Sequence, residues 1–455
     1  MPTAEDLISH VVVDGVPRDE RAEELAVAGL LDTLAIGIAG LRERGPRVVR
    51  TVLEPVPGGV ATWEGHDRYA ATDAALLHGA ACHSLDWDDF MHPMHGHCSS
   101  VLLPALWGLA ERDRRSGADV VDAYLVGYQV DHLVSLVLSH GHYRRGWHAT
   151  STIGTIGAAA AAARLLGLGA DAAAAALGVA ASQAGGLQTN FGTPTKGLHA
   201  GLAARSGVLA AQLAAAGLTS SRTWLAGEHG MLAAFGGDAD PGDAARLVAD
   251  GIAARHGITT GWGLVQKPYA SCGCSHAAVD AVVSLTGDLE VDEIERIEVH
   301  VDPAVTRTMR ETVPTDELDS RYSVSWVVAA AAADGTASPA QFSPASIARQ
   351  DVLALRERVD VVPDLEVGDD DRFAARVVVH APDGVRETTV HHPQGHPRNP
   401  MTAEQQRAKQ RLALSTVTDD PDGLVDLLST LPTSSDVGAL GGRIRAFPHR
   451  PAAET

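Results

Sequence analysis

The sequence predicts a mainly α-helical protein, with a large all-helical domain and a smaller α+β domain. Hydrophobic residues make up 45% of the 455 residues, which is enough to form a large buried core. Alanine occurs in long runs between short loops that contain Gly, Thr or His, and aromatic residues make up only 4%. Small side chains let helices pack closely. Alternating and β-branched segments follow Lys267, so the α+β domain is expected there.

The first part of the chain is expected to be helical throughout. Its apolar residues recur at helical spacing in segments that are bounded by glycine or polar loops. The predicted helices cover residues 21–38, 71–83, 101–112, 120–138, 153–166, 170–183 and 201–214.

The second part combines helix and sheet. A predicted helix at 276–285 leads to residues 296–301, whose alternating pattern predicts a strand. Two β-branched runs, at 373–380 and 386–391, flank a Pro-Asp-Gly turn, and together they predict a β-hairpin.

The last part is expected to return to the helical domain. Thr402 and Gln405 have the spacing of a capping box, which predicts a helix that continues through Leu414. The predicted organisation is therefore a helical domain at 1–266, an α+β domain at 267–400 and a C-terminal helical segment at 401–455.

The net charge excludes several classes of partner. Acidic residues number 57 and basic residues 36, which gives a charge of −21, so neither nucleic acid nor an anionic membrane surface is expected to bind. The N-terminus lacks the apolar core of a signal peptide, and the long apolar stretch at 153–181 is interrupted by Arg164 and Asp171. Four cysteines are too few for a disulfide framework. We therefore expect a cytoplasmic protein that binds a small molecule.

Four loops that precede apolar helices contain the candidate functional groups. Each combines glycine or proline with His, Lys or Cys, and they lie at 92–100, 146–150, 191–196 and 267–276. A helix N-terminus offers unpaired N–H groups and a partial positive charge, which suit a carboxylate. Any one loop is explained equally well by ordinary helix caps and surface histidines. Four such loops in one acidic chain favour a shared pocket.

An acidic segment just before the first loop has two interpretations. Asp86, Asp88 and Asp89 either form a solvated helix end, or Asp86 orients one of the nearby histidines. Together with His92, His95 and His97 the aspartates could also ligate a metal ion, but this spacing matches no zinc signature. The sequence therefore favours a site without metal.

Cysteine and nucleotide chemistry receive little support. Cys272 and Cys274 form C-x-C and have no second cysteine pair, which argues against a zinc or thioredoxin-like site. A nucleophilic Cys272 beside Lys267 is conceivable, but no nucleophile elbow accompanies it. Phosphate-binding glycine motifs are also absent from the sequence.

The loops resemble those of the MmgE/PrpD family, whose members include dehydratases, decarboxylases and epimerases. The matching motifs keep the family's order over nearly the whole chain. They are D-x-D-D at 86–89, G-H-x-S-S at 96–100, G-W-H-x-T-S-T-x-G at 146–154, F-G-T-x-T-K-x-x-H at 191–199, K-x-Y-x-S-C at 267–272 and N-P-M-T at 399–402. The resemblance implies that the α+β domain is a lid, that the active site lies between the domains, and that the protein is a homodimer without metal or organic cofactor.

The resemblance also implies roles for individual residues. The family's catalytic positions correspond to Asp86, His97, His148, Lys196 and Lys267. His97 is preferred over His95 for the second position, although the loop from Phe90 to Cys98 varies in length within the family. Further candidates for substrate binding are His95, Thr195, His276 and three positions that depart from the pattern of decarboxylase or dehydratase members. These departures are Phe90 in place of threonine, Cys272 in place of histidine and Trp326 in place of tyrosine, and they make the predicted pocket less polar.

The shared chemistry of such a site is removal of a proton next to a carboxylate of a small di- or tricarboxylic acid. Lys196 and Lys267 would neutralise carboxylates and the developing enolate, and His148 and His97 are the expected base and acid. The outcome would be loss of water, loss of CO₂ or epimerisation. One alternative is a repurposed member that acts on or only binds a bulkier, less charged ligand, as Phe90 and Trp326 suggest. A second alternative is a metalloenzyme that uses the histidine loop.

Overall fold

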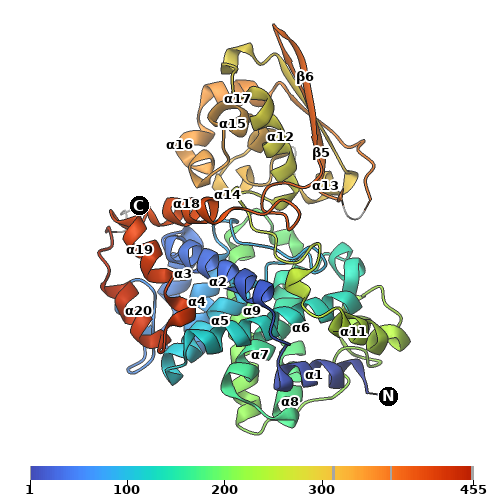
Figure 1. Ribbon diagram of the computed structural model, residues 1–455, viewed down its shortest axis with the longest axis vertical. Helices are drawn as coiled ribbons and strands as arrows, with labels where there is room; N and C mark the ends of the chain where they lie inside the picture. The colour runs from blue at the N-terminus through green and yellow to red at the C-terminus, as the bar shows by residue number, and fades with distance from the viewer. Residues whose placement is uncertain (1, 310–312, 369–370, 452–455) are drawn as a thin grey trace. The chain divides into compact units, whose positions relative to one another are not determined.

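The computed structural model describes residues 2–309, 313–368 and 371–451 (Figure 1). The chain forms two compact units. The first comprises Met1–Val265 together with Thr402–Thr455, and the second comprises Gln266–Met401. The fold is mainly α, as the sequence predicts, and a four-stranded sheet lies in the second unit.

Long helices rich in alanine and glycine form the core of the first unit. They are α2 (Glu20–Gly40), α4 (Ala71–Cys82), α5 (Ser99–Asp113), α6 (Gly117–Arg144), α7 (Ala149–Leu166) and α9 (Pro194–Ala215). Helix α9 packs against α4 and α7, and α7 also packs against α6. Every residue of α7 except Arg164 and Leu166 is buried, which explains why this helix consists almost entirely of small side chains.

Helices α4 and α9 approach each other so closely that only glycine fits between them. A Cβ atom on Gly201 would lie 2.1 Å from the carbonyl oxygen of Leu76, and one on Gly79 would lie 2.6 Å from the Cα atom of Gly201. Further along, a Cβ atom on Gly197 would lie 3.5 Å from the Cα atom of Ser84. The two helices are therefore antiparallel, and the C-terminal end of α4 lies beside the N-terminal end of α9.

Shorter elements complete the part of the first unit that precedes residue 266. They are α1 (Ala4–Asp14), α3 (Arg44–Val52), the antiparallel strands β1 (Val60–Ala61) and β2 (Arg68–Tyr69), α8 (Ala170–Ala181), η1 (Gln188–Asn190), α10 (Met231–Phe235), η2 (Pro241–Asp243), α11 (Ala244–Ala253) and η3 (Gly257–Thr259).

The C-terminal segment packs against the N-terminal helices of the same unit. It forms α18 (Ala403–Leu414), α19 (Pro421–Leu428), η8 (Leu431–Thr433) and α20 (Val437–Ala446). Helix α18, drawn in red in Figure 1, packs on α2, drawn in blue. The buried Lys409 Nζ donates hydrogen bonds to Asp32 Oδ2 at 2.7 Å and to the carbonyl oxygen of Trp87 at 2.9 Å. This ammonium group joins three distant parts of the chain.

The second unit is built on a mixed sheet of strand order β4-β3-β5-β6. The strands are β3 (Arg296–Val301), β4 (Val359–Val362), β5 (Ala375–Ala381) and β6 (Gly384–Val390). Strand β4 is parallel to β3, and β5 and β6 form an antiparallel hairpin in which Ala381 faces Gly384. Its helices are η4 (Gly273–Ser275), α12 (His276–Thr286), η5 (Val291–Glu293), α13 (Pro303–Thr308), α14 (Glu317–Ser320), α15 (Val324–Asp334), η6 (Pro339–Phe342), α16 (Pro344–Ile347) and α17 (Gln350–Arg356). Helix α12 packs on β5 and β6, and α15 packs on β4.

Most of the predicted elements are confirmed within a few residues. The predicted helices correspond to α2, α4, α5, α6, α7, α8, α9 and α12, and the predicted strand and hairpin correspond to β3, β5 and β6. The capping box at Thr402 and Gln405 is formed and begins α18, which ends at Leu414 as expected. Strand β4 was not predicted, because four residues give too short a pattern for a strand to be recognised.

Within the described residues, no single helix has the length and apolar character needed to cross a membrane. One pair of consecutive helices, α2 and α3, meets those criteria only when taken together, and the pair is bent by 74°.

The contact between α4 and α9 predicts that Gly201→Ala is destabilising. The added methyl group would meet backbone atoms, which cannot move aside without separating the helices, so we expect a loss of about 1–3 kcal/mol in the free energy of unfolding. Gly442→Ala in α20 is the control, because a Cβ atom there meets nothing within 4 Å. That variant should be neutral or slightly more stable. Urea denaturation measures both, and equal stability of the two variants would contradict the close contact.

Candidate active site

A buried ion pair lies where α9 begins. Lys196 is in the first turn of α9, and side chains on a helix tilt toward its N-terminus. Its Nζ donates a hydrogen bond to Asp86 Oδ1 at 3.0 Å, with side-chain exposures of only 8% and 5%. Asp86 has a φ of 49°, a left-handed conformation that aspartate tolerates better than most residues. This turn follows α4 and directs the carboxylate toward Lys196.

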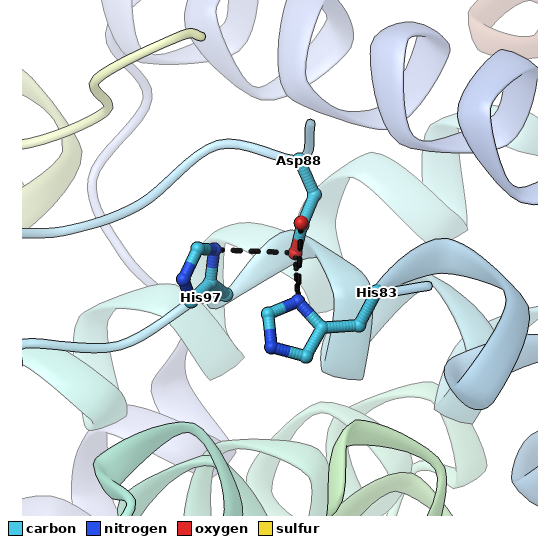
Figure 2. Close-up of side chains that lie close together, drawn as sticks. All are labelled: His83, Asp88 and His97. Atoms are coloured by element: carbon cyan, nitrogen blue, oxygen red, sulfur yellow. Dashed lines mark hydrogen bonds and ion pairs between the residues drawn. The ribbon is translucent and has the colours of Figure 1, made fainter. Parts of the chain in front are cut away.

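A second carboxylate lies between two imidazole rings (Figure 2). Asp88 Oδ2 is 2.8 Å from His83 Nδ1 and 3.2 Å from His97 Nδ1, and both rings are turned toward this carboxylate. His97 Nδ1 is also 2.8 Å from the carbonyl oxygen of Asp89. Asp88 and His83 are fully buried, whereas 13% of the His97 side chain is exposed. A carboxylate only accepts hydrogen bonds, so both rings donate from Nδ1 to the oxygens around them.

Burial and neighbouring groups set the charges of this cluster. Burial alone would raise the pKa of Asp88, but the imidazoles of His83 and His97 and their hydrogen bonds outweigh it and hold that pKa well below its usual value. Burial lowers the pKa of His83 to about 3, although Asp88 opposes the shift. At neutral pH the cluster therefore combines an ionised carboxylate with a neutral His83 ring.

His148 lies directly before α7 and contacts His199 of α9. It is the N-cap residue of α7 and is 1% exposed, and its Nδ1 is 3.0 Å from Nδ1 of His199. Burial, together with His83 and Lys196, lowers the pKa of His148 well below 6.5. The ring centroids of His148 and His83 are 5.8 Å apart, so this pair adjoins the Asp88 cluster.

The loop before α5 is fixed against the start of α7. The backbone N–H of His97 donates to Thr150 Oγ1 at 3.1 Å. A Cβ atom on Gly96 would lie 2.9 Å from the backbone nitrogen of Thr150, so a larger residue would push the loop away. The close approach holds His97 beside the N-terminus of α7.

Two aromatic rings contact the imidazoles. The Phe191 ring lies 5.0 Å from the His148 ring and 5.8 Å from Lys196 Nζ, and the Phe90 ring lies 6.3 Å from the His97 ring. Backbone hydrogen bonds with Val265 hold Phe90 in place. Phe90 thus contributes an apolar surface at a position where the family resemblance led us to expect a hydroxyl group.

Four of the predicted catalytic residues thus lie in one cluster of the first unit, namely Asp86, His97, His148 and Lys196. Thr195 adjoins Lys196 in the first turn of α9. His95 lies in a different group of side chains. Its φ of 54° lies in the left-handed region. Its Nε2 forms a hydrogen bond with His140 Nδ1, and its ring stacks on that of Tyr143 with 4.7 Å between the ring centroids.

The other predicted site residues belong to the second unit. Lys267 is 1% exposed and precedes η4, and Cys272 is the partly buried N-cap residue of η4. His276 begins α12 and is buried, with its Nε2 3.3 Å from the carbonyl oxygen of Ser271. Trp326 is completely buried in α15.

In the part of the chain that the structure describes, one group of side chains has the proximity that a metal ion requires. It consists of His83, Asp88 and His97, whose potential ligand atoms all lie within 4.8 Å of one another. This differs from the set considered from the sequence, because His92 and His95 lie with His140 and Tyr143. Hydrogen bonds to carboxylate and carbonyl oxygens already account for both Nδ1 atoms.

His83, His199 and Phe191 were not singled out from the sequence, and Asp88 was considered only as one of three aspartates next to the histidine loop. His199 and Phe191 lie within the motif at 191–199, and Asp88 lies within D-x-D-D, so motif membership could have drawn attention to them. His83 follows directly after an apolar helix and precedes Asp88 by five residues. The signal for this histidine was its position at a helix end next to an acidic segment.

Comparison with known proteins agrees with the arrangement of motifs along the chain. The model of the MmgE/PrpD N-terminal domain matches residues 6–244, and that of the C-terminal domain matches residues 269–426. A cis-aconitate decarboxylase of Homo sapiens is 29% identical over 90% of this chain and 88% of its own length. One of Mus musculus is 28% identical, over 90% of this chain and 86% of its own length. One of Aspergillus terreus is 27% identical, over 95% of this chain and 93% of its own length. Because the two family models together cover most of the sequence in the expected order, the chain belongs to the MmgE/PrpD family.

Proposed function

We propose that this protein is a lyase or isomerase that moves a proton next to a carboxylate of a small di- or tricarboxylic acid, without a metal or organic cofactor. The observation that carries the proposal is the buried Lys196–Asp86 pair at the start of α9, beside the imidazoles of His97 and His148. The family and the names of the relatives support a lyase that acts on a carboxylate.

The start of α9 suits a carboxylate for two reasons. The N-terminus of a long helix has a partial positive charge, and Lys196 adds a full charge in its first turn. Asp86 partly neutralises that ammonium, so a bound carboxylate would share Lys196 with Asp86 or displace it. This local charge also overcomes the repulsion expected from a chain of net charge −21.

His148 and His97 are the proposed base and acid. A neutral imidazole is needed to remove a proton, and burial keeps His148 neutral at neutral pH by lowering its pKa. His97 keeps some exposure, which suits a group that exchanges protons with solvent. The charge that develops on the substrate carboxylate as the proton leaves would be stabilised by Lys196.

Cis-aconitate is the first substrate to test, but the substrate preference is expected to differ from that of the relatives. Phe90, Cys272 and Trp326 depart from the pattern of decarboxylase and dehydratase members. The proposed roles of Lys267, Cys272, His276 and Trp326 remain predictions from the sequence. Phe90, whose ring contacts the His97 ring, favours the second candidate function, in which a bulkier, less charged ligand is bound.

Proton exchange distinguishes the two candidate functions. The protein is incubated in deuterated water with a panel of di- and tricarboxylic acids that includes cis-aconitate, and the products are followed by proton NMR. Incorporation of deuterium next to a carboxylate, with or without loss of water or CO₂, is the expected result. Tight binding of an acid with no exchange would contradict the enzymatic proposal and support a binding role.

Lys196→Ala should impair both binding and catalysis. The variant loses the cation that neutralises the substrate and the hydrogen bond that this cation donates to Asp86. We expect a higher KM and a fall in kcat/KM of about 10²-fold or more. Lys196→Arg, which keeps the charge, is the matched control and should retain more activity. Steady-state kinetics would contradict the proposed role if Lys196→Ala left both constants unchanged.

His148→Ala should lower kcat and have little effect on KM. Loss of the proton-transfer group is expected to reduce kcat by about 10²–10⁴-fold. The wild-type protein should also keep its activity below pH 6.5, because the lowered pKa of His148 keeps the ring neutral there. Circular dichroism checks that the variant is folded. Near-normal kcat in the folded variant would show that His148 is structural.

Activity should survive removal of metal ions. Exhaustive dialysis against EDTA is expected to leave kcat unchanged, because hydrogen bonds account for both Nδ1 atoms in the His83, Asp88 and His97 group. A loss of turnover that one added divalent metal restores would instead assign these three side chains as its ligands.

A further inference from the structure

One ring nitrogen of His83 forms a hydrogen bond, and the other can accept one from a ligand. The ring is fully buried, and its Nδ1 lies 2.8 Å and 3.1 Å from the two carboxylate oxygens of Asp88. Because an ionised carboxylate only accepts hydrogen bonds, the hydrogen of the neutral ring is on Nδ1. The lone pair is then on Nε2, and this atom has no hydrogen-bond partner among the described residues.

The ring lies among the residues already placed in the site. Its centroid is 4.4 Å from that of His97 and 5.8 Å from that of His148. A buried acceptor without a donor destabilises the folded protein, so such atoms in native structures usually bind a ligand or an ordered water molecule. An acceptor next to the proposed acid and base is well placed to contact the substrate.

His78 shows that burial alone does not make such a site. It lies on the same helix and is also fully buried, and neither of its ring nitrogens has a partner in the described part of the chain. Its ring stacks on Trp63 at 3.8 Å, and among the described residues no carboxylate accepts a hydrogen bond from it. His78 is therefore a packed core residue and a matched control for His83.

We propose that His83 is a third imidazole of the active site, held by Asp88 so that its Nε2 accepts a hydrogen bond from a hydroxyl or protonated carboxyl group of the bound acid. The inference rests on the proposed function, which supplies the acid. Asp88 is then a positioning residue for two rings, because the same Oδ2 atom is also 3.2 Å from His97 Nδ1. The single carboxylate of Asp88 would then fix the tautomer of both the His83 ring and the His97 ring.

NMR of histidine labelled with ¹⁵N tests the arrangement without any enzymatic assay. His83→Gln assigns the resonances. We expect Nδ1 of His83 to carry the hydrogen, Nε2 to be unprotonated, and the Nε2 resonance to move when malate or cis-aconitate binds. Asp88→Asn should change the tautomer populations of His83 and His97. The opposite tautomer in the wild type, or an Nε2 resonance unaffected by an acid that calorimetry shows to be bound, would overturn the proposal.

His83→Asn separates contact with the substrate from a structural role. The side-chain amide of asparagine can still donate to Asp88, but it has no atom at the position of Nε2. We expect kcat/KM to fall by about tenfold or more, which is the loss of one hydrogen bond to a substrate. His78→Asn makes the same change in the same helix and should leave kcat/KM within about twofold. Equal activity of His83→Asn and the wild type would overturn the proposal.

The two proposals fail in different ways. If the wild-type protein binds and converts no carboxylic acid, the proposed function is wrong, and an Nδ1–H tautomer that Asp88→Asn alters still supports the Asp88–His83 arrangement. If acids are converted but His83→Asn behaves like His78→Asn, the proposed function stands and the role of His83 is wrong. A transition metal ion bound stoichiometrically by the Nδ1 atoms of His83 and His97 would also contradict the proposed role of His83.

Discussion

Where Gly201 of α9 meets α4 there is no space for a side chain, because a Cβ atom on Gly201 would lie 2.1 Å from a backbone oxygen of α4. The site depends on this contact. Antiparallel packing places the end of α4, which carries His83, beside the beginning of α9, which carries Lys196. The third helix, α7, packs on α9, and His148 is its N-cap residue. The runs of alanine and glycine thus do more than fill the core. Because these side chains are small, three helix ends come close together, and so do the polar residues at those ends.

Burial then determines which of these polar groups are charged. An ionised group in an apolar interior needs a partner, and Asp86 and Lys196 provide this for each other. The imidazoles of His83 and His148 lose their charge instead, because desolvation lowers the pKa of both. Asp88 stays ionised because ring N–H groups donate to it. The same interior therefore contains both fixed charges and neutral rings that can accept a proton.

Residues with a strong local signal could be singled out from the sequence, and those whose direction depends on rotation about a helix axis could not. The loops before α5, α7 and α9 could be recognised because a polar or glycine-containing stretch is followed by an apolar run, and Asp86, His97, His148 and Lys196 lie at or beside those helix ends. His83 was missed because helical periodicity does not show which way a residue at the end of a buried helix points. The neighbours of His95 could not be predicted either, since its left-handed φ directs the ring toward His140. Strand β4 could be identified only in the structure, from its parallel pairing with β3.

The contacts of Lys409 have a consequence for the order in which the chain folds during synthesis. Its ammonium group binds Asp32 in α2 and the carbonyl oxygen of Trp87, within the segment that holds Asp86 and Asp88. A ribosome adds residue 409 long after residues 32 and 87, and the entire Gln266–Met401 unit is made in between. Until then Asp32 lacks its buried counter-charge, and the carbonyl oxygen of Trp87 lacks the hydrogen bond from Lys409. The core of the N-terminal helices can therefore be completed only after the C-terminal segment has been synthesised. The Gln266–Met401 unit, in contrast, has its whole sequence available earlier.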